Sequence, residues 1–294
     1  MNAMTEPLPP SVVTAPLGRR LGACSEIRAR DATLFVLLIA VGLWADQMFE
    51  LWGQIVTSIA CWVVILAFMH RTRGDMRATV LVCLALMTAA EIFASLIWGL
   101  YLYRLHNIPP FIPPGHAMML LVALFLGARL GTWVLFAAPA VALACAGYAM
   151  WTGTDSLSIV LTPVFIAGMW LARDRKLYAI TFLLALALEL YGTWVGNWRW
   201  EERMPWFGFS MANPPLCIGA LYCVRDVLIG IILNVMRRMQ RVPVPVFEAP
   251  PHTLLPQNAA APLHSTRAYQ QLAEAAVRSP QNVRETEKTA VVPQ

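Results

Sequence analysis

Eight apolar runs constrain this chain more than any other feature of its sequence. It is 58% hydrophobic and only 13% charged, and a soluble domain carries more charge than that. Because one core cannot bury so much apolar sequence, the sequence predicts an all-α polytopic membrane helix bundle of about eight spans. The expected spans are Ala32–Met48, Leu51–His70, Ala78–Tyr103, Pro114–Ala128, Leu130–Met150, Leu157–Ala172, Leu177–Gly196 and Pro214–Met236.

Positive charge predicts the orientation of these spans. Loops on the cytoplasmic side of a membrane carry an excess of Lys and Arg. Such residues follow the second, fourth, sixth and eighth runs: Arg71, Arg73, Arg77, Arg129, Arg173, Arg175, Lys176, Arg237, Arg238 and Arg241. An even number of spans places all of them on one side, whereas seven spans would break the pattern. We therefore expect both termini in the cytoplasm and the protein in the plasma (inner) membrane.

Two polar segments flank the expected transmembrane domain of residues 32–241. Residues 1–31 are rich in Pro and Arg and precede the first apolar run, which favours a cytoplasmic leader over a cleaved signal peptide. Residues 242–294 are rich in Pro, Ala, Gln and charge, which is typical of a disordered tail. Within this tail, Ser265–Ser279 is a candidate for a short helix.

The sequence also argues against several classes of function. The net charge of +5 comes from arginines beside apolar runs, so it reflects topology, and no nucleic-acid partner is expected. The six cysteines form no CxxC pair, so neither a disulfide framework nor a metal site is predicted. Nucleotide-binding, metalloprotease and serine-hydrolase motifs are absent from the sequence, and no cofactor is predicted.

Two glutamates lie inside apolar runs, and a similar element follows each of them. Glu91 and Glu189 are 98 residues apart. Each is followed by a glycine, an aromatic pair at i, i+2 and a double proline. After Glu91 these are Tyr101 and Tyr103, then Pro113-Pro114; after Glu189 they are Trp198 and Trp200, then Pro214-Pro215. The similar spacing suggests an internal repeat of two parallel four-helix halves.

The residues around each glutamate have local structural interpretations. Proline is tolerated in the first turn of a helix, so both double prolines predict helix starts, with Asn213 as a cap in the second copy. On a helix, positions i and i+2 lie on different faces. The aromatic pairs therefore indicate that the helix loosens there, or that one ring faces lipid as part of an interfacial aromatic belt.

Ionisable residues inside the hydrocarbon layer are costly and mark candidate sites. We expect Glu91 to be protonated through burial, with His116 as its proton partner. We expect Glu189 to pair with Arg225 on the next span, because each charge would offset the desolvation of the other. Asp226 points about 100° away from Arg225 on a helix and requires a separate partner. The alternative is that these groups are only polar contacts between helices.

The element around each glutamate resembles motifs of integral-membrane carotenoid-modifying proteins, the hydratase and lycopene-cyclase-like families. Its residues are Glu91, Gly99, Tyr101, Tyr103 and Pro109 in one copy, and Glu189, Gly192, Gly196, Trp198, Trp200 and Pro205 in the other. The adjacent acidic pair that the cyclases carry after a proline is absent. The resemblance implies acid catalysis on an isoprenoid double bond within the bilayer.

Three functions follow as hypotheses. The first is a membrane enzyme in which Glu91 or Glu189, with His116, protonates a lipophilic isoprenoid or polyene substrate. Its expected substrate-binding residues are Tyr101, Tyr103, Trp198, Trp200, Asn213, Arg225 and Asp226. The second is a proton-coupled transporter of a small solute, with the carboxylates carrying protons. The third is a non-catalytic assembly protein. The partners expected from the sequence are the lipid bilayer and a lipophilic small molecule.

Overall fold

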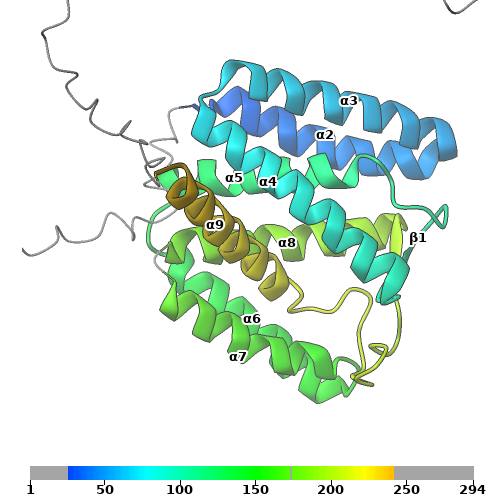
Figure 1. The fold of residues 1–294 in the computed structure, drawn as a ribbon. Coiled ribbons are helices and arrows are strands. Elements are labelled where there is room, and N and C mark those ends of the chain that lie inside the picture. The colour runs from blue at the N-terminus through cyan, green and yellow to red at the C-terminus, as the bar shows by residue number, and fades with distance from the viewer. Residues whose placement is uncertain (1–25, 173, 242–294) are drawn as a thin grey trace, which may run out of the picture. The chain divides into compact units, whose positions relative to one another are not determined.

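The computed structural model describes residues 26–172 and 174–241, and these fold into a helical bundle (Figure 1). The first four α-helices are α2 (Ala29–Met48), α3 (Glu50–Arg71), α4 (Gly74–Glu91) and α5 (Ile112–Arg129). The second four are α6 (Val134–Thr152), α7 (Ser156–Leu171), α8 (Arg175–Val195) and α9 (Gly219–Arg241). A π-helical segment, η3 (Ile92–Ile97), continues α4, and two short strands complete the described part: β1 (Tyr101–Tyr103) and β2 (Trp198–Trp200).

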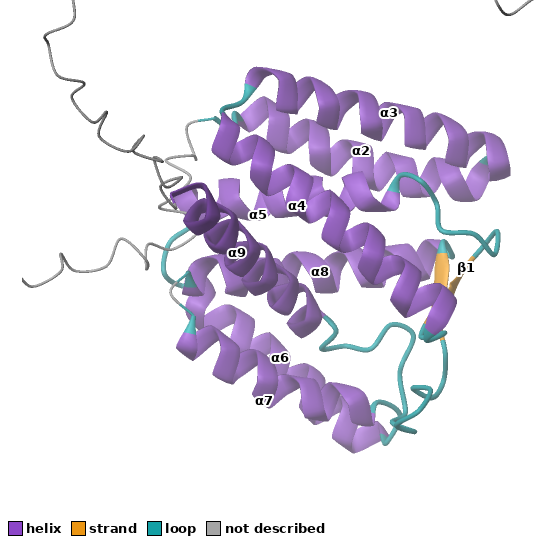
Figure 2. Ribbon diagram, in the orientation of Figure 1, coloured by secondary structure: helices purple, strands orange, loops and turns teal. Residues whose placement is uncertain are grey.

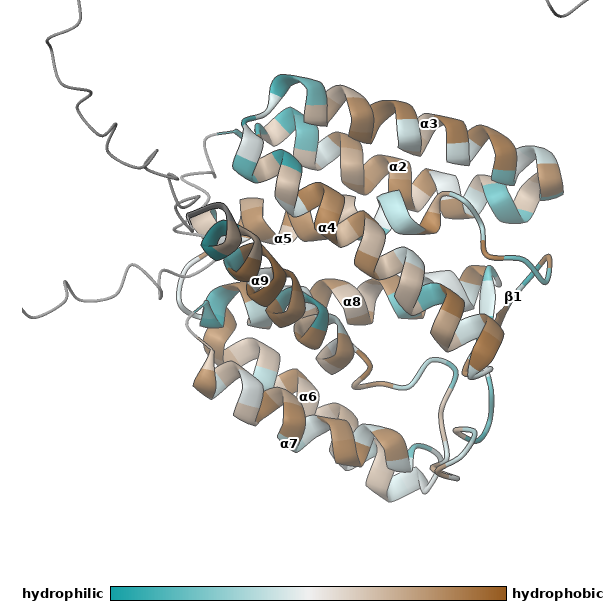
Figure 3. Ribbon diagram, in the orientation of Figure 1, coloured by the Kyte–Doolittle hydropathy of each residue, from teal (hydrophilic) through white to brown (hydrophobic). Residues whose placement is uncertain are grey.

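The structure confirms that the chain is mostly helical, and its apolar helices are compatible with a membrane protein. Seven of the helices are long and apolar enough to cross a membrane, and α7 is a shorter apolar helix. Apolar residues run along every helix of the bundle (Figure 3), and the strands form only a small sheet at one end (Figure 2). The expected leader lies mostly outside the described residues, and the expected tail, with its candidate helix Ser265–Ser279, lies entirely outside them.

The centre of the bundle is formed by α4, α5, α8 and α9. Helix α4 packs against both α5 and α9, and α8 packs against the same two helices. The pairs α2–α3 and α6–α7 lie on opposite sides of this centre (Figure 1). Glu91 ends α4 and Glu189 lies in α8. The two glutamates are therefore on the two central helices that both pack against α5 and α9.

The third and the last of the expected spans differ most from the helices of the structure. The third was expected to reach Tyr103, but helical structure stops at Ile97, and Gly99 then adopts a left-handed conformation with φ of 71°. Glycine adopts this conformation without the steric penalty of a side chain. The chain therefore turns there and continues as β1, so Tyr101 and Tyr103 lie on a strand.

The last span was expected to begin at Pro214-Pro215, with Asn213 as its cap, but α9 begins at Gly219. The side chain of Asp155, just before α7, accepts a 2.8 Å hydrogen bond from the amide of Leu216. The side chain of Ser158, within α7, accepts one of 2.8 Å from the amide of Cys217. These tertiary bonds hold the segment before α9 in a turn. The matching prediction for Pro113-Pro114 is confirmed, because both prolines lie in the first turn of α5.

Candidate functional site

The two aromatic pairs meet in a two-stranded antiparallel ribbon. Tyr101 lies opposite Trp200, and Tyr103 lies opposite Trp198. Both strands bury these alternate positions and expose the residue between them. Because side chains alternate across a strand, the i, i+2 spacing that separates two rings on a helix places both on one face here. All four rings therefore point to the interior of the bundle.

A glycine two residues before each strand sets the direction in which the strand runs. Gly99 precedes β1 with φ of 71°, and Gly196 precedes β2 with φ of 96°. Left-handed backbone at the end of a helix is the usual position for glycine, because other residues are strained there. The chain thus leaves η3 and α8 through similar turns.

Glu91 accepts hydrogen bonds from both tyrosines of β1. Its Oε2 lies 2.8 Å from the Tyr101 hydroxyl and 2.7 Å from the Tyr103 hydroxyl. Burial, followed by the charge of Glu91, raises the pKa of each phenol well above its usual range, so both keep their protons and act as donors. Oε1 lies 3.0 Å from Nε2 of His116 at the start of α5, so the structure brings the expected proton partner into contact with Glu91.

Glu189 accepts hydrogen bonds from both tryptophans of β2. Its Oε2 lies 2.8 Å from Nε1 of Trp198 and 3.1 Å from Nε1 of Trp200. Its Oε1 accepts a hydrogen bond of 2.6 Å from the hydroxyl of Tyr222 in α9. Both glutamates therefore receive two aromatic donors on Oε2 and meet a side chain of the following helix at Oε1.

Tyr222 is a site residue that sequence reasoning missed. It lies in the helix after the second double proline, as His116 lies in the helix after the first. That correspondence was the only available signal, and the unequal loop lengths concealed it. The rings of His116 and Tyr222 lie 5.4 Å apart between centroids, so the partners of the two glutamates are also neighbours.

Gly192 creates the space for one indole of the ribbon. A Cβ at this position would lie 2.0 Å from Cη2 of Trp198, closer than any two carbon atoms can approach without a bond. Only glycine therefore lets the Trp198 ring lie against α8 and reach Glu189, one helical turn before Gly192.

A cavity of about 510 Å³ lies beneath the ribbon, and both glutamates line it. This volume is within the range of small-molecule sites. His116, Tyr222, Arg225 and the four ribbon rings also contribute to the wall, which is otherwise almost entirely apolar. A second hollow, of about 840 Å³, lies on the ribbon's other side and is lined by polar residues such as Arg104, Arg199 and Glu202. Tyr103, Trp198 and Trp200 line both hollows.

The apolar cavity reaches the surface of the bundle between η3 and α9. Phe93 of η3 and Leu221, Val224 and Leu228 of α9 line it, and all four side chains are exposed. The lining residues from α2 and α3 are buried or half-buried. The opening is therefore on the side of the bundle, in helices that are apolar enough to lie in a membrane.

The predicted Glu189–Arg225 pair is wrong. Nε of Arg225 donates to Oδ1 of Asp226 at 2.8 Å, and Oδ2 of Asp226 accepts from the Thr181 hydroxyl at 2.8 Å. Adjacent helical positions point about 100° apart, but the long arginine side chain bends back to its neighbour. Glu189 obtains its hydrogen bonds from neutral aromatic donors, so it does not need this cation.

Asn213 and Asp226 lie beside the cavity and do not line it. Oδ1 of Asn213 accepts a 2.9 Å hydrogen bond from the backbone N–H of Trp200, so it supports the outer edge of the ribbon. It lines the polar hollow. Asp226 is buried against Arg225 and Thr181. The other expected binding residues, Tyr101, Tyr103, Trp198, Trp200 and Arg225, all line the apolar cavity.

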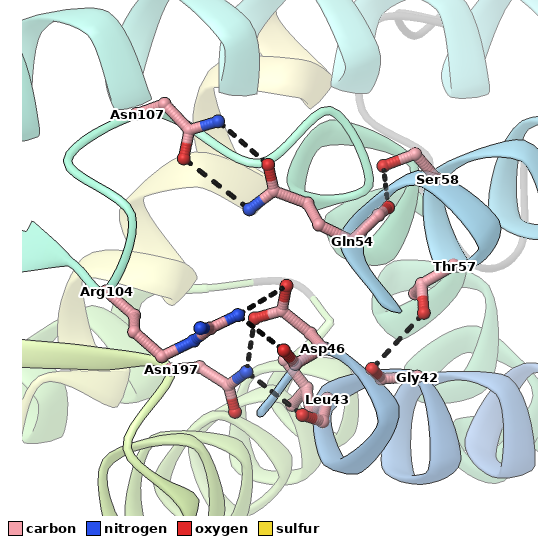
Figure 4. A network of polar contacts seen from close by, with 9 residues as sticks. All are labelled: Gly42, Leu43, Asp46, Gln54, Thr57, Ser58, Arg104, Asn107 and Asn197. Carbon is pink, nitrogen blue, oxygen red and sulfur yellow. Dashed lines mark hydrogen bonds and ion pairs between the residues drawn. The ribbon is translucent and has the colours of Figure 1, made fainter. Parts of the chain in front are cut away.

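A polar network ties the ribbon to the end of α2 (Figure 4). Asp46, which is 1% exposed, accepts hydrogen bonds from Arg104 just after β1 and from Asn197 just before β2, the latter at 2.7 Å. Asn197 also donates to the Leu43 carbonyl at 3.0 Å. One carboxylate therefore holds both strands. None of these residues was predicted as part of the site.

Within residues 26–172 and 174–241, no group of three or more His, Cys, Asp or Glu side chains is placed to hold a metal ion. Comparisons with protein-family models, curated proteins and solved structures found no match to this chain.

Proposed function

We propose that this protein is a membrane-embedded enzyme that acts on a lipophilic isoprenoid or polyene substrate by acid–base catalysis. The observation that supports it best is that Glu91 and Glu189, from two central helices, line one apolar cavity of ligand size. Polar contacts between helices do not require a cavity. Two carboxyl groups that line the same cavity can give and take a proton on opposite sides of a bound molecule.

The hydrogen bonds indicate which oxygen of each glutamate carries the proton. Indole N–H groups can only donate, so Oε2 of Glu189 is occupied as an acceptor, whereas the Tyr222 hydroxyl at Oε1 can donate or accept. A proton on Glu189 therefore belongs on Oε1. At Glu91 the corresponding oxygen faces His116, so the proton there is shared between a carboxylate and an imidazole. Glu189 has no cationic partner, and in the proposal it is the resting acid.

The proposed reaction is a proton-catalysed isomerisation that moves a C=C bond. The O–H bond of Glu189 breaks as the proton adds to one carbon of a C=C bond, and the π electrons form the new C–H bond. The neighbouring carbon becomes a carbocation, which the π faces of the ribbon rings stabilise. Loss of a proton from an adjacent carbon to the Glu91–His116 pair restores a C=C bond. Substrate and product are isomers, and return of the proton to Glu189 completes the cycle.

The lateral opening supports a substrate that arrives from the lipid. Its exposed rim residues, among them Phe93 and Val224, are apolar, and in the membrane they would face acyl chains. The same proposal includes eight spans with both termini in the cytoplasm, a plasma-membrane location and a repeat of two four-helix halves. The matching bonds of Glu91 and Glu189 support the repeat.

Solvent deuterium provides the test. The purified protein in nanodiscs is incubated in D2O with a lipid extract of its host cells, and carbon-bound deuterium is measured by mass spectrometry after back-exchange in H2O. Carboxyl protons exchange with solvent between turnovers, so the enzyme should place deuterium on carbon in one lipophilic component.

Glu189→Gln should abolish this incorporation and Glu91→Gln should reduce it at least 100-fold, the usual scale of a general acid or base. Glu202→Gln, at an exposed carboxylate, should leave it unchanged. The proposed enzymatic activity would be refuted if the wild type and both cavity variants incorporated deuterium equally, or if the wild type incorporated none.

A proton-coupled transporter is the second candidate, and the polar hollow favours it. Only the ribbon separates this hollow from the two carboxylates, since three of its rings line both spaces. Movement of the ribbon would connect Glu91 and Glu189 to the outer side. Proton flux in proteoliposomes that requires a co-transported solute and is lost in Glu91→Gln would identify this function.

A further inference from the structure

We infer that Arg225 anchors an oxygen-bearing end of the ligand, so that the cavity selects isoprenoids with a terminal carbonyl or hydroxyl group over pure hydrocarbons. This inference rests on the proposed function and specifies its substrate class. It is carried by a buried guanidinium that lines a mostly apolar cavity with much of its hydrogen-bonding capacity unused.

The hydrogen bonds of Arg225 leave donors available. The residue is 4% exposed, and Nε donates to Asp226. Nη2 lies 2.7 Å from the same oxygen of Asp226, but neither Nη1 nor Nη2 makes a hydrogen bond. A guanidinium has five N–H donors, and buried donors are normally satisfied. An oxygen acceptor from a bound molecule would supply the missing partner.

The pairing with Asp226 explains why the acceptor should be neutral. Asp226 balances the charge of Arg225 and is itself satisfied by Thr181 at 2.8 Å. A phosphate or carboxylate would add an uncompensated negative charge near two glutamates. A carbonyl or hydroxyl oxygen accepts the hydrogen bonds without adding charge.

A purely structural role does not account for the pair. Buried ion pairs contribute little to stability compared with apolar residues of similar volume, and within the membrane charged groups are costly. Arg225 and Asp226 are neighbours on one helix, so their ion pair does not join helices. Among the residues that the structure describes, the only hydrogen bond from the pair to α8 is the one with Thr181.

The position of Arg225 also limits where the reaction occurs. It lies three residues after Tyr222, nearly one turn of α9, and its guanidinium carbon lies 5.4 Å from the centre of the Tyr222 ring. The Tyr222 hydroxyl lies 2.6 Å from Oε1 of Glu189, the oxygen assigned to carry the proton. When Arg225 holds the oxygen of the ligand, the ligand's bonds nearest to that oxygen lie next to the acid Glu189. The double bond that reacts is therefore near the polar end of the ligand.

The test compares farnesal, an isoprenoid aldehyde, with farnesene, a related hydrocarbon. Binding is measured in nanodiscs and corrected for partition into empty discs. The wild type should bind farnesal at least tenfold more tightly, the scale expected for hydrogen bonds to a charged group. The carbonyl stretching band of bound farnesal should also shift to lower frequency. The double variant Arg225→Met/Asp226→Leu leaves no unpaired charge and should fold, but it should lose both the preference and the shift.

The pair of half-buried Arg237 and exposed Asp75, 3.5 Å apart at another place on α9 and α4, provides the control. Arg237→Met/Asp75→Leu should retain the preference for farnesal. Equal binding of both ligands by the wild type, or a preference that survives in Arg225→Met/Asp226→Leu, would overturn the anchor. If neither ligand binds, the lipophilic site itself fails. If farnesal is preferred but no deuterium reaches carbon in any lipid, the acid–base reaction fails and the anchor remains.

Discussion

Tyr101 and Trp200 lie opposite each other in the ribbon, with ring centroids 4.7 Å apart, yet they donate hydrogen bonds to different glutamates. The Tyr101 hydroxyl lies 2.8 Å from Glu91, and the indole nitrogen of Trp200 lies 3.1 Å from Glu189. Displacement of either strand therefore disturbs both carboxyl groups. The ribbon is the element that makes the two glutamates parts of one site.

Gly192→Ala tests whether the position of Trp198 matters. The added methyl group would overlap the indole ring, so Trp198 should leave Glu189 and the protein should lose about 1–3 kcal/mol of stability. Thermal unfolding in detergent and the deuterium assay measure the two effects. Gly147→Ala in α6, where a Cβ meets nothing within 4 Å, should leave deuterium incorporation unchanged and should not lower stability, because alanine favours helix. Equal behaviour of the two variants would show that the ribbon tolerates displacement of this ring.

Gly99→Ala isolates the backbone requirement of the turn before β1. A Cβ there has open space around it, but φ is 71°, so the expected loss of about 1–2 kcal/mol comes from conformation alone. Chemical unfolding measures it. Gly74→Ala, also in open space and without a positive φ, should be neutral or slightly stabilising because alanine favours helix. A Gly99→Ala protein as stable as the wild type would contradict the assigned turn.

Asp46→Ala should release both ends of the ribbon. It leaves the Nδ2 group of Asn197 and the guanidinium of Arg104 without their carboxylate, so we expect a loss of roughly 3 kcal/mol. Hydrogen exchange should accelerate at the Arg104 amide, which donates to the Asn197 carbonyl at 2.9 Å. Asp75→Ala, at a mostly exposed carboxylate, is the comparison. Unchanged exchange at Arg104 would mean that Asp46 does not hold the ribbon.

Val224→Trp should narrow the opening between η3 and α9. Val224 lines the cavity and is 43% exposed, whereas Val227 on the same helix is 41% exposed and does not line it. Association of farnesal should slow at least fivefold in Val224→Trp and remain unchanged in Val227→Trp. Stopped-flow fluorescence measures the rate. Equal rates in the two variants would place the entrance elsewhere.

Alkaline pH should destabilise the ribbon. The pKa of Tyr101 and that of Tyr103 are raised above the ordinary value in the folded protein. The unfolded chain therefore loses these protons first, and stability should fall as pH rises above about 10. Thermal unfolding from pH 8 to about 11 should show a smaller fall in Tyr101→Phe/Tyr103→Phe than in the wild type. An equal fall in both proteins would contradict the burial of these hydroxyls.

The glutamates and their aromatic neighbours were predictable because their spacing is local. Ionisable residues in apolar runs stand out in a sequence, and the similar elements after Glu91 and Glu189 drew attention to the four rings. The contact of Glu91 with His116 followed from the short connection between their helices. Asp46 comes from a distant segment and had no such signal, and Tyr222 was missed because the longer second loop concealed its correspondence with His116.

Hydropathy alone determined that this chain forms apolar helices long enough to cross a membrane, because apolar length is a property of each run by itself. The end of α4, the late start of α9 and the pairing of β1 with β2 were decided only by tertiary structure. The start of α9 and the pairing of the strands depend on hydrogen bonds between segments far apart in the chain, such as Asp155 with Leu216 and Leu100 with Glu201. Arg225 took Asp226 as its partner because Glu189 was already satisfied by the ribbon, and a pattern of residues along one helix does not contain that information.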